Sequence, residues 1–108
     1  MQDAQLIPTV NVEEAEFMVS NGALLVDVRE QDEWDEERIA NAKLMPLSDI
    51  NTWYSNLPTH QNIVFYCHSG NRSGQVVAAL VQQVGMTNVH NMAGGITAWT
   101  HSQRLTET

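Results

Sequence analysis

The sequence has little positive charge and only one cysteine. Its 108 residues include 5 Lys and Arg against 13 Asp and Glu, so the formal net charge is −8 at neutral pH. Proteins that bind nucleic acid or anionic membranes gather Lys and Arg on one surface, and this composition therefore disfavours both partners. One cysteine excludes an internal disulfide and a multi-cysteine zinc site.

Long apolar runs and targeting signals are also missing. No segment reaches the roughly 18 apolar residues of a membrane span. Residues 1–6 have neither the basic start nor the apolar stretch of a signal peptide. We therefore expect a cytoplasmic protein whose thiol stays reduced. A length of 108 residues with 43% hydrophobic content predicts one globular domain over residues 1–108.

The acidic residues are concentrated in the first part of the chain. Residues 1–60 hold 12 of the 13 acids and have a net charge of −9, whereas residues 61–108 have a net charge of +1. Solvation of early helices by their acidic side chains explains this distribution. A second interpretation is that an anion site in the later part must be free of carboxylates.

Short apolar runs alternate with helical patterns along the chain. Strands are expected at 23–28, 43–45, 62–66 and 89–92, and helices at 11–22, 30–37, 48–57, 74–84 and 94–99. This alternation on short connections predicts an α/β sandwich with a largely parallel sheet. The run at 62–66 is continuously apolar after its first residue, which indicates a central strand buried on both faces.

Cys67 follows this central strand and precedes a helix. Ligands of open α/β sheets bind beyond the carboxyl ends of the strands. There the amides and the positive end of the helix dipole stabilise a thiolate, and Arg72 adds a full charge. We therefore expect a thiol pKa below the usual value of about 8.5. The alternative is that Cys67 is a small hydrophobic residue of the core.

The residues after Cys67 favour the reactive interpretation. Gly70 permits backbone angles that let successive amides converge on one point. Ser69 and Ser73 offer hydroxyl groups to the same anion, although Ser73 could equally be the N-cap of the following helix.

Three motifs resemble the rhodanese family of sulfurtransferases. Residues 67–73, Cys-His-Ser-Gly-Asn-Arg-Ser, resemble the family's active-site loop. Residues 27–34 resemble its Asp-x-Arg-x-x-x-Glu-aromatic segment, and 94–99 resemble its closing Gly-Gly-x-x-x-Trp motif. The order and spacing match over roughly residues 8–101. The chain departs from the family at 37–42, where Glu-Arg-Ile-Ala-Asn-Ala replaces the usual Gly-His-Ile-x-Gly-Ala.

The resemblance implies a rhodanese-like three-layer sandwich whose small, mainly parallel central sheet is flanked by helices. It also implies that Cys67 takes a sulfane sulfur from thiosulfate, releases sulfite and carries the sulfur as a persulfide. Cyanide, a small thiol or a dithiol protein such as thioredoxin would then accept it, and neither a cofactor nor a metal is implied. Arg72 would attract thiosulfate and stabilise the departing sulfite. The implied substrate-binding residues are His68, Ser69, Gly70, Asn71, Arg72 and Ser73.

Other residues of these motifs have simpler interpretations. We favour a structural ion pair for Arg29, with Glu33 as its partner, over a place for Asp27 and Arg29 in the pocket. His68 is expected to tune the entrance, because this chemistry needs no acid or base. Residues 94–95 are expected to form a tight turn that allows close packing, and Trp99 is a core or lid aromatic.

Three other function classes share parts of this pattern. A Cys-dependent phosphatase or arsenate reductase would place five residues between Cys and Arg, whereas four separate Cys67 from Arg72. A non-catalytic rhodanese-like interaction domain commonly lacks the active-site cysteine, whereas this chain has Cys67. A persulfide carrier that delivers sulfur to a partner protein differs from the thiosulfate enzyme mainly in its donor and acceptor.

Overall fold

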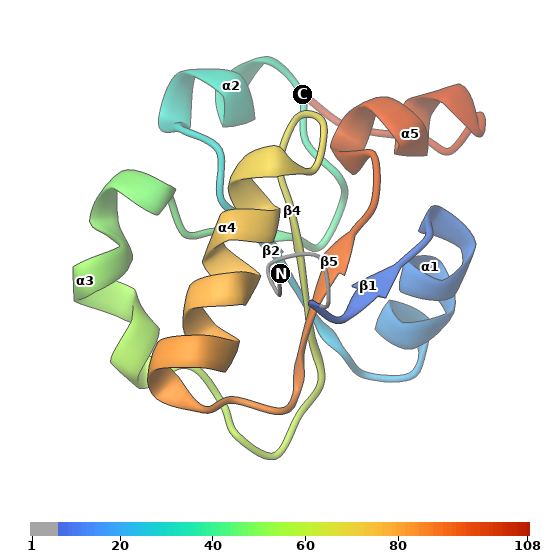
Figure 1. The fold of residues 1–108 in the computed structure, drawn as a ribbon. Helices are drawn as coiled ribbons and strands as arrows, with labels where there is room; N and C mark the ends of the chain where they lie inside the picture. Colours follow the sequence, from blue (N-terminus) through green and yellow to red (C-terminus); the bar gives the residue numbers. More distant parts are fainter. Residues whose placement is uncertain (1–6) are drawn as a thin grey trace.

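The computed structural model describes residues 7–108, and its centre is one sheet of five parallel strands in the order β1-β5-β4-β2-β3 (Figure 1). The strands are β1 Thr9–Val10, β2 Leu24–Asp27, β3 Lys43–Leu44, β4 Ile63–Tyr66 and β5 Val89–Met92. The predicted central strand is confirmed, because every residue of β4 is buried and both of its edges are paired. β1 was not expected, since two residues are too few to show a pattern.

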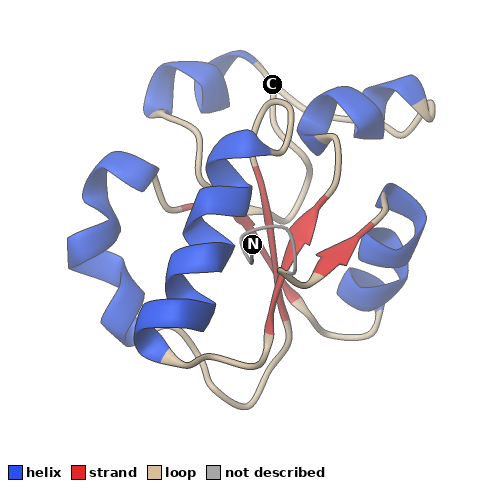
Figure 2. Cartoon of the chain, viewed as in Figure 1, coloured by secondary structure: helices blue, strands red, loops and turns tan. Residues whose placement is uncertain are grey.

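Helices cover both faces of this sheet (Figure 2). They are α1 Val12–Ser20, α2 Gln31–Glu36, α3 Ile50–Trp53, α4 Asn71–Ala79 and α5 Gly95–His101. Two 3-10 turns, η2 Leu47–Asp49 and η3 Tyr54–Asn56, flank α3, and a π-helical turn, η4 Leu80–Val84, continues α4. The expected three-layer α/β sandwich is confirmed. None of the helices among residues 7–108 is long and apolar enough to cross a membrane.

Alternate side chains of β4 fill two separate cores. Ile63 and Phe65 face α3 and α4, and Trp53 of α3 stacks on Phe65 with ring centroids 6.4 Å apart. Val64 and Tyr66 face α1 and α5 on the other side. Because successive side chains of a strand point to opposite faces, a wholly apolar strand is needed between two helical layers.

The start of α1 agrees with the sequence expectation, whereas the helix expected at 48–57 and the start of α4 differ from it. Asn11 caps α1 and forms a capping box with Glu14, as its pattern indicates. The expected capped helix at 48–57 is a 3-10 turn, one helical turn and a second 3-10 turn, and the Ser48 hydroxyl donates to Glu30 Oε1 at 2.7 Å.

The start of α4 corrects an expectation about Ser73. Gly70, with φ 103°, is the N-cap of α4, so the helix begins at Asn71 and not near residue 74. Ser73 therefore lies inside the first turn and is not the N-cap. Its side chain is free to face the loop that precedes the helix.

Candidate functional site

The site lies at the carboxyl end of the sheet, where Cys67 directly follows β4. The turn between β4 and α4, the start of α5 and the short helix α2 all lie at this end (Figure 1). The Cys67 side chain faces the core layer beneath α4, and the residue is 1% exposed. The structure thus combines burial, which the core interpretation predicted, with a position at a helix N-terminus.

Three hydrogen-bond donors converge on Cys67 Sγ. The amide of Gly70 donates at 3.1 Å, and the amide and hydroxyl of Ser73 donate at 3.4 Å each. The left-handed conformation of Gly70 turns its amide toward the sulfur. The loop therefore forms a cradle for one anionic sulfur atom.

The pKa of the Cys67 thiol lies below its ordinary value. Burial opposes ionisation, but hydrogen bonds from the Ser73 side chain and from the amides of Ser73, Gly70 and Ser69 outweigh it. The predicted direction of the pKa is confirmed. The expected loop amides are among its causes, and the charge of Arg72 also interacts with Cys67.

The first turn of α5 holds this loop from the other side. The amide of Ile96 donates to the Cys67 carbonyl at 2.9 Å, and that of Thr97 donates to the His68 carbonyl at 3.1 Å. A Cβ on Gly95 would overlap both carbonyl oxygens. The expected tight glycine turn is confirmed, and it lets α5 fix the carbonyls while the loop amides face Sγ.

Asn91 is a site residue that the sequence reasoning missed. It lies in β5 and is 7% exposed. Its Nδ2 donates to the Gly70 carbonyl at 3.2 Å, and its Oδ1 lies 2.6 Å from Ser73 Oγ, whose single hydrogen is shared between this oxygen and Cys67 Sγ. A polar side chain in an expected strand was the available signal, because buried amides need hydrogen-bond partners.

The ion pairs near the site differ from the expected ones. Arg29 pairs with Asp27 at 2.8 Å, and both residues are buried. The expectation that Glu33 pairs with Arg29 is wrong, because residues 27 and 29 project to the same side of an extended chain. Glu33 binds Arg72 instead, with two hydrogen bonds of 2.8 and 2.9 Å.

The remaining loop residues lie at the surface. His68 is exposed, with Nε2 3.5 Å from Thr97 Oγ1, and lines a cavity beside the loop. Ser69 and Asn71 are exposed, and their side chains make no hydrogen bond within residues 7–108. The Ser69 amide, and not its hydroxyl, acts on the Cys67 thiol, and a role of the hydroxyl toward a bound anion stays a prediction.

The cavity beside the loop has a volume of about 330 Å³. It is lined by Arg29, Glu33, Glu36, Glu37, His68, Ile96, Thr97 and Thr100. The idea that the site is free of carboxylates is wrong, because α2 brings glutamates of the acidic half to the loop. Within residues 7–108, no three His, Cys, Asp or Glu side chains are grouped so that they could hold a metal ion.

A sequence model of the rhodanese-like domain family matches residues 11–102. The chain belongs to the rhodanese family. It is 42% identical over 76 residues to a sulfurtransferase of Allochromatium vinosum, and this alignment covers 70% of each chain. It is 29% identical over 89 residues to the thiosulfate sulfurtransferase GlpE of Coxiella burnetii, and this alignment covers 82% of each chain.

Solved structures and longer relatives extend this comparison. A rhodanese-related protein from Thermoplasma volcanium shares the fold with a TM-score of 0.81 at 23% identity, over 93% of this chain and 97% of that one. The chain also matches the probable adenylyltransferase/sulfurtransferase MoeZ of Mycobacterium tuberculosis at 40% identity over 77 residues. The match covers 69% of this chain and spans only 19% of the length of MoeZ.

The chain departs from the family at 37–42 but keeps the turn. Asn41 stands where the family has its second glycine, and it adopts a left-handed conformation with φ 70°. Asn tolerates this conformation better than other residues with a Cβ. Ile39 stays buried and its amide donates to the Tyr66 hydroxyl at 3.1 Å, so the altered segment keeps its place against β4.

Proposed function

We propose that this rhodanese is a sulfurtransferase that moves a sulfane sulfur through a persulfide on Cys67. The donor is thiosulfate or another sulfane-sulfur compound, and the acceptor is cyanide, a small thiol or a dithiol protein such as thioredoxin. The convergence of Gly70 and Ser73 donors on a buried Sγ carries this proposal. The functional unit is one rhodanese-like domain with its core over about residues 8–101.

The transfer consists of two displacements at sulfur. The Cys67 thiolate attacks the outer sulfur of thiosulfate, the S–S bond of thiosulfate breaks, and its electron pair leaves with sulfite. A dianion and a thiolate thus become a persulfide anion on Cys67 and a sulfite dianion. An acceptor such as cyanide then attacks the terminal sulfur, which regenerates the thiolate and releases thiocyanate. Covalent catalysis of this kind divides one difficult step into two easier ones.

The loop stabilises the charge at each stage. Donors that already face Sγ in the free protein need no reorganisation when the sulfur becomes anionic. Asn91 holds Ser73, and the α5 amides hold the Cys67 and His68 carbonyls, so the cradle is fixed by two further elements. We assign Cys67 as the nucleophile and the loop residues 68–73 as the substrate-binding segment.

The same geometry argues against a phosphatase or arsenate reductase. Those enzymes hold a tetrahedral oxyanion in a loop with five residues between Cys and Arg. Here four residues separate Cys67 from Arg72, and the loop amides face a single sulfur atom. A persulfide carrier is the second candidate function, because the buried sulfur suits storage as well as turnover.

Substitution of the single cysteine tests the proposal. Incubation with thiosulfate should raise the mass of the intact protein by one sulfur atom, and Cys67→Ser should lose both this adduct and thiocyanate formation from cyanide. Circular dichroism shows whether the variant is folded. Thiocyanate formation by folded Cys67→Ser above the rate without protein would overturn the proposal.

A further inference from the structure

Arg72 is bound on its outer side by Glu33. Arg72 lies in the first turn of α4, one residue before Ser73, and is the one cation in the Cys67 loop. Its Nη1 and Nη2 donate to Glu33 Oε1 and Oε2 at 2.8 and 2.9 Å. This two-point arrangement is the strongest that Arg forms with a carboxylate, and it leaves the positive charge largely neutralised.

Glu33 is itself held in place by its own helix. Its Oε1 also accepts from the amide of Glu30 at 3.0 Å, at the start of α2. The hydrogen bonds from Arg72 lower the pKa of Glu33 to about 2, so the carboxylate is charged at neutral pH. The ion pair therefore joins α2 to the start of α4 beside the Cys67 loop, and it does not depend on one flexible side chain.

The other charged groups at the entrance add negative charge. Glu36 and Glu37 line the cavity beside the loop together with Glu33. Arg29 lines it as well, but its guanidinium is paired with the buried Asp27. Arg29 of the cavity and Arg72 of the loop are thus each paired with a carboxylate, whereas Glu36 of the cavity is exposed. A dianion that approaches the Cys67 loop from this side meets an excess of negative charge.

We propose that Glu33 is a specificity-determining residue that neutralises Arg72 and so directs the site toward sulfur donors of low negative charge, such as persulfides, over the thiosulfate dianion. The inference rests on the proposed transfer through Cys67. It names the charge class of the donor and favours the persulfide-carrying role of this rhodanese. In that reaction the thiolate takes the outer sulfur of a donor persulfide, the donor S–S bond breaks, and the donor leaves as a thiolate.

Two donors that differ by one charge provide the test. Thiosulfate is a dianion, and methanethiosulfonate is a monoanion in which a methyl group replaces one oxygen; the first releases sulfite and the second methanesulfinate. The rate constant for persulfide formation on Cys67, followed by mass spectrometry of quenched samples, measures donor use without any acceptor. Glu33→Gln keeps an oxygen for the Glu30 amide and removes the charge that holds Arg72.

We expect Glu33→Gln to increase the rate constant about tenfold for thiosulfate and about threefold for methanethiosulfonate, because the interaction scales with donor charge. Both increases should shrink in roughly 1 M salt. Asp32→Asn is the matched control, since Asp32 is exposed on the same helix and its loss does not release Arg72. It should change either rate less than about twofold. In the double variant Glu33→Gln, Arg72→Gln, the rate constant for thiosulfate should no longer rise more than that for methanethiosulfonate.

The outcomes separate this inference from the proposed function. Absence of a Cys67 persulfide with both donors in the wild-type protein would overturn the sulfur transfer itself. Two outcomes would overturn the role of Glu33 but leave the sulfur transfer standing. One is that Glu33→Gln changes the rate constant equally for both donors, and the other is that Asp32→Asn changes it as much as Glu33→Gln does. If Glu33→Gln does not fold, Glu33→Ala is measured with the same two donors.

Discussion

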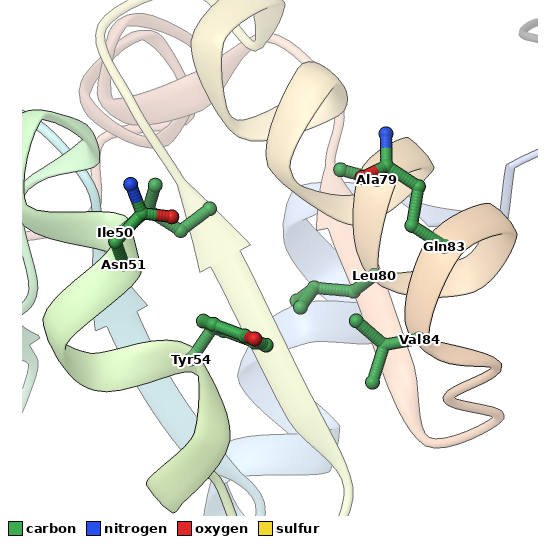
Figure 3. Close-up of a pocket in the computed structure, with 7 residues that line it drawn as sticks. All are labelled: Ile50, Asn51, Tyr54, Ala79, Leu80, Gln83 and Val84. Atoms are coloured by element: carbon green, nitrogen blue, oxygen red, sulfur yellow. The ribbon is translucent and has the colours of Figure 1, made fainter.

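Two cavities of nearly equal volume lie at opposite ends of α4. One, of about 320 Å³, lies between α3 and the C-terminal part of α4 with η4, where Tyr54, Leu80 and Val84 approach one another (Figure 3). The other, of about 330 Å³, lies beside the Cys67 loop at the helix N-terminus. Volume does not distinguish them. Only the second lies beside the loop whose amides face a sulfur atom, because the last turns of a helix expose carbonyls instead.

The lining of the two cavities shows the same difference. The cavity of Figure 3 is lined by apolar and amide side chains and a tyrosine, whereas the cavity beside the loop is lined by glutamates, an arginine and a histidine. One helix thus stabilises the fold at its C-terminal end and the sulfur anion at its N-terminal end. Substitutions at the two ends should separate stability from reactivity.

Leu80→Ala should give the largest effect, and on stability alone. Leu80 is 1% exposed in the core layer beneath α4, so its truncation should lower the free energy of unfolding by about 3 kcal/mol. Urea denaturation measures this change, and the rate of persulfide formation in native buffer should stay within about twofold. Gln83→Ala, at an exposed position of the same cavity, should alter stability by less than about 0.5 kcal/mol. A large loss of rate in a stable Leu80→Ala protein would connect this cavity to the chemistry.

Ser73→Ala should affect reactivity at the other end of the helix. It removes the hydroxyl that lies 3.4 Å from Sγ, so the pKa of Cys67 should rise and the pH midpoint of thiol alkylation should move upward. Persulfide formation at neutral pH should slow about tenfold, the cost of one hydrogen bond to a charged group. Ser55→Ala is the control, because Ser55 is exposed and lies in η3, outside the Cys67 loop. An unchanged alkylation profile in Ser73→Ala would contradict the contribution of this hydroxyl.

The smallest effect concerns the ion pair between Glu33 and Arg72. Because the folded-state pKa of Glu33 is lowered from 4.5 to about 2, its contribution to stability is present above pH 4.5 and is lost as the pH falls toward 2. Both side chains are about one-third exposed, so solvent screening limits the contribution to about 0.5 kcal/mol. Urea denaturation at a series of pH values should show this loss between pH 4.5 and 2 in the wild-type protein. The same pH-dependent loss in Glu33→Gln would assign it to other carboxylates.

Local patterns predicted most of the elements and the central part of the site. The apolar run of β4 and the capping box of α1 depend on neighbouring residues only, and both are present in the structure. Cys67 could be placed at the carboxyl end of the sheet because parallel strands share that edge. The two-residue β1 and the broken helix around α3 were missed, since such short segments depend on their tertiary neighbours.

Contacts between distant segments could not be predicted in the same way. Asn91 reaches Ser73 across 18 positions of sequence, and Glu33 reaches Arg72 across 39. The motif spacing suggested a partner for Arg29 within the same segment, but Glu33 points from α2 toward α4. Short-range spacing is informative along one element, whereas pairing between elements depends on how the helices pack on the sheet.

The sequence by itself determined the alternation of strands and helices, the position of the single cysteine and the excess of acids in the first 60 residues. Periodicity and composition are properties of neighbouring residues, so no fold is needed to observe them. The tertiary structure alone decided that the acidic α2 lies beside the Cys67 loop and that Glu33 pairs with Arg72, the cation of that loop. Electrostatic energy depends on distance in space, and folding brings the acidic and the reactive halves of this chain to the same edge of the sheet.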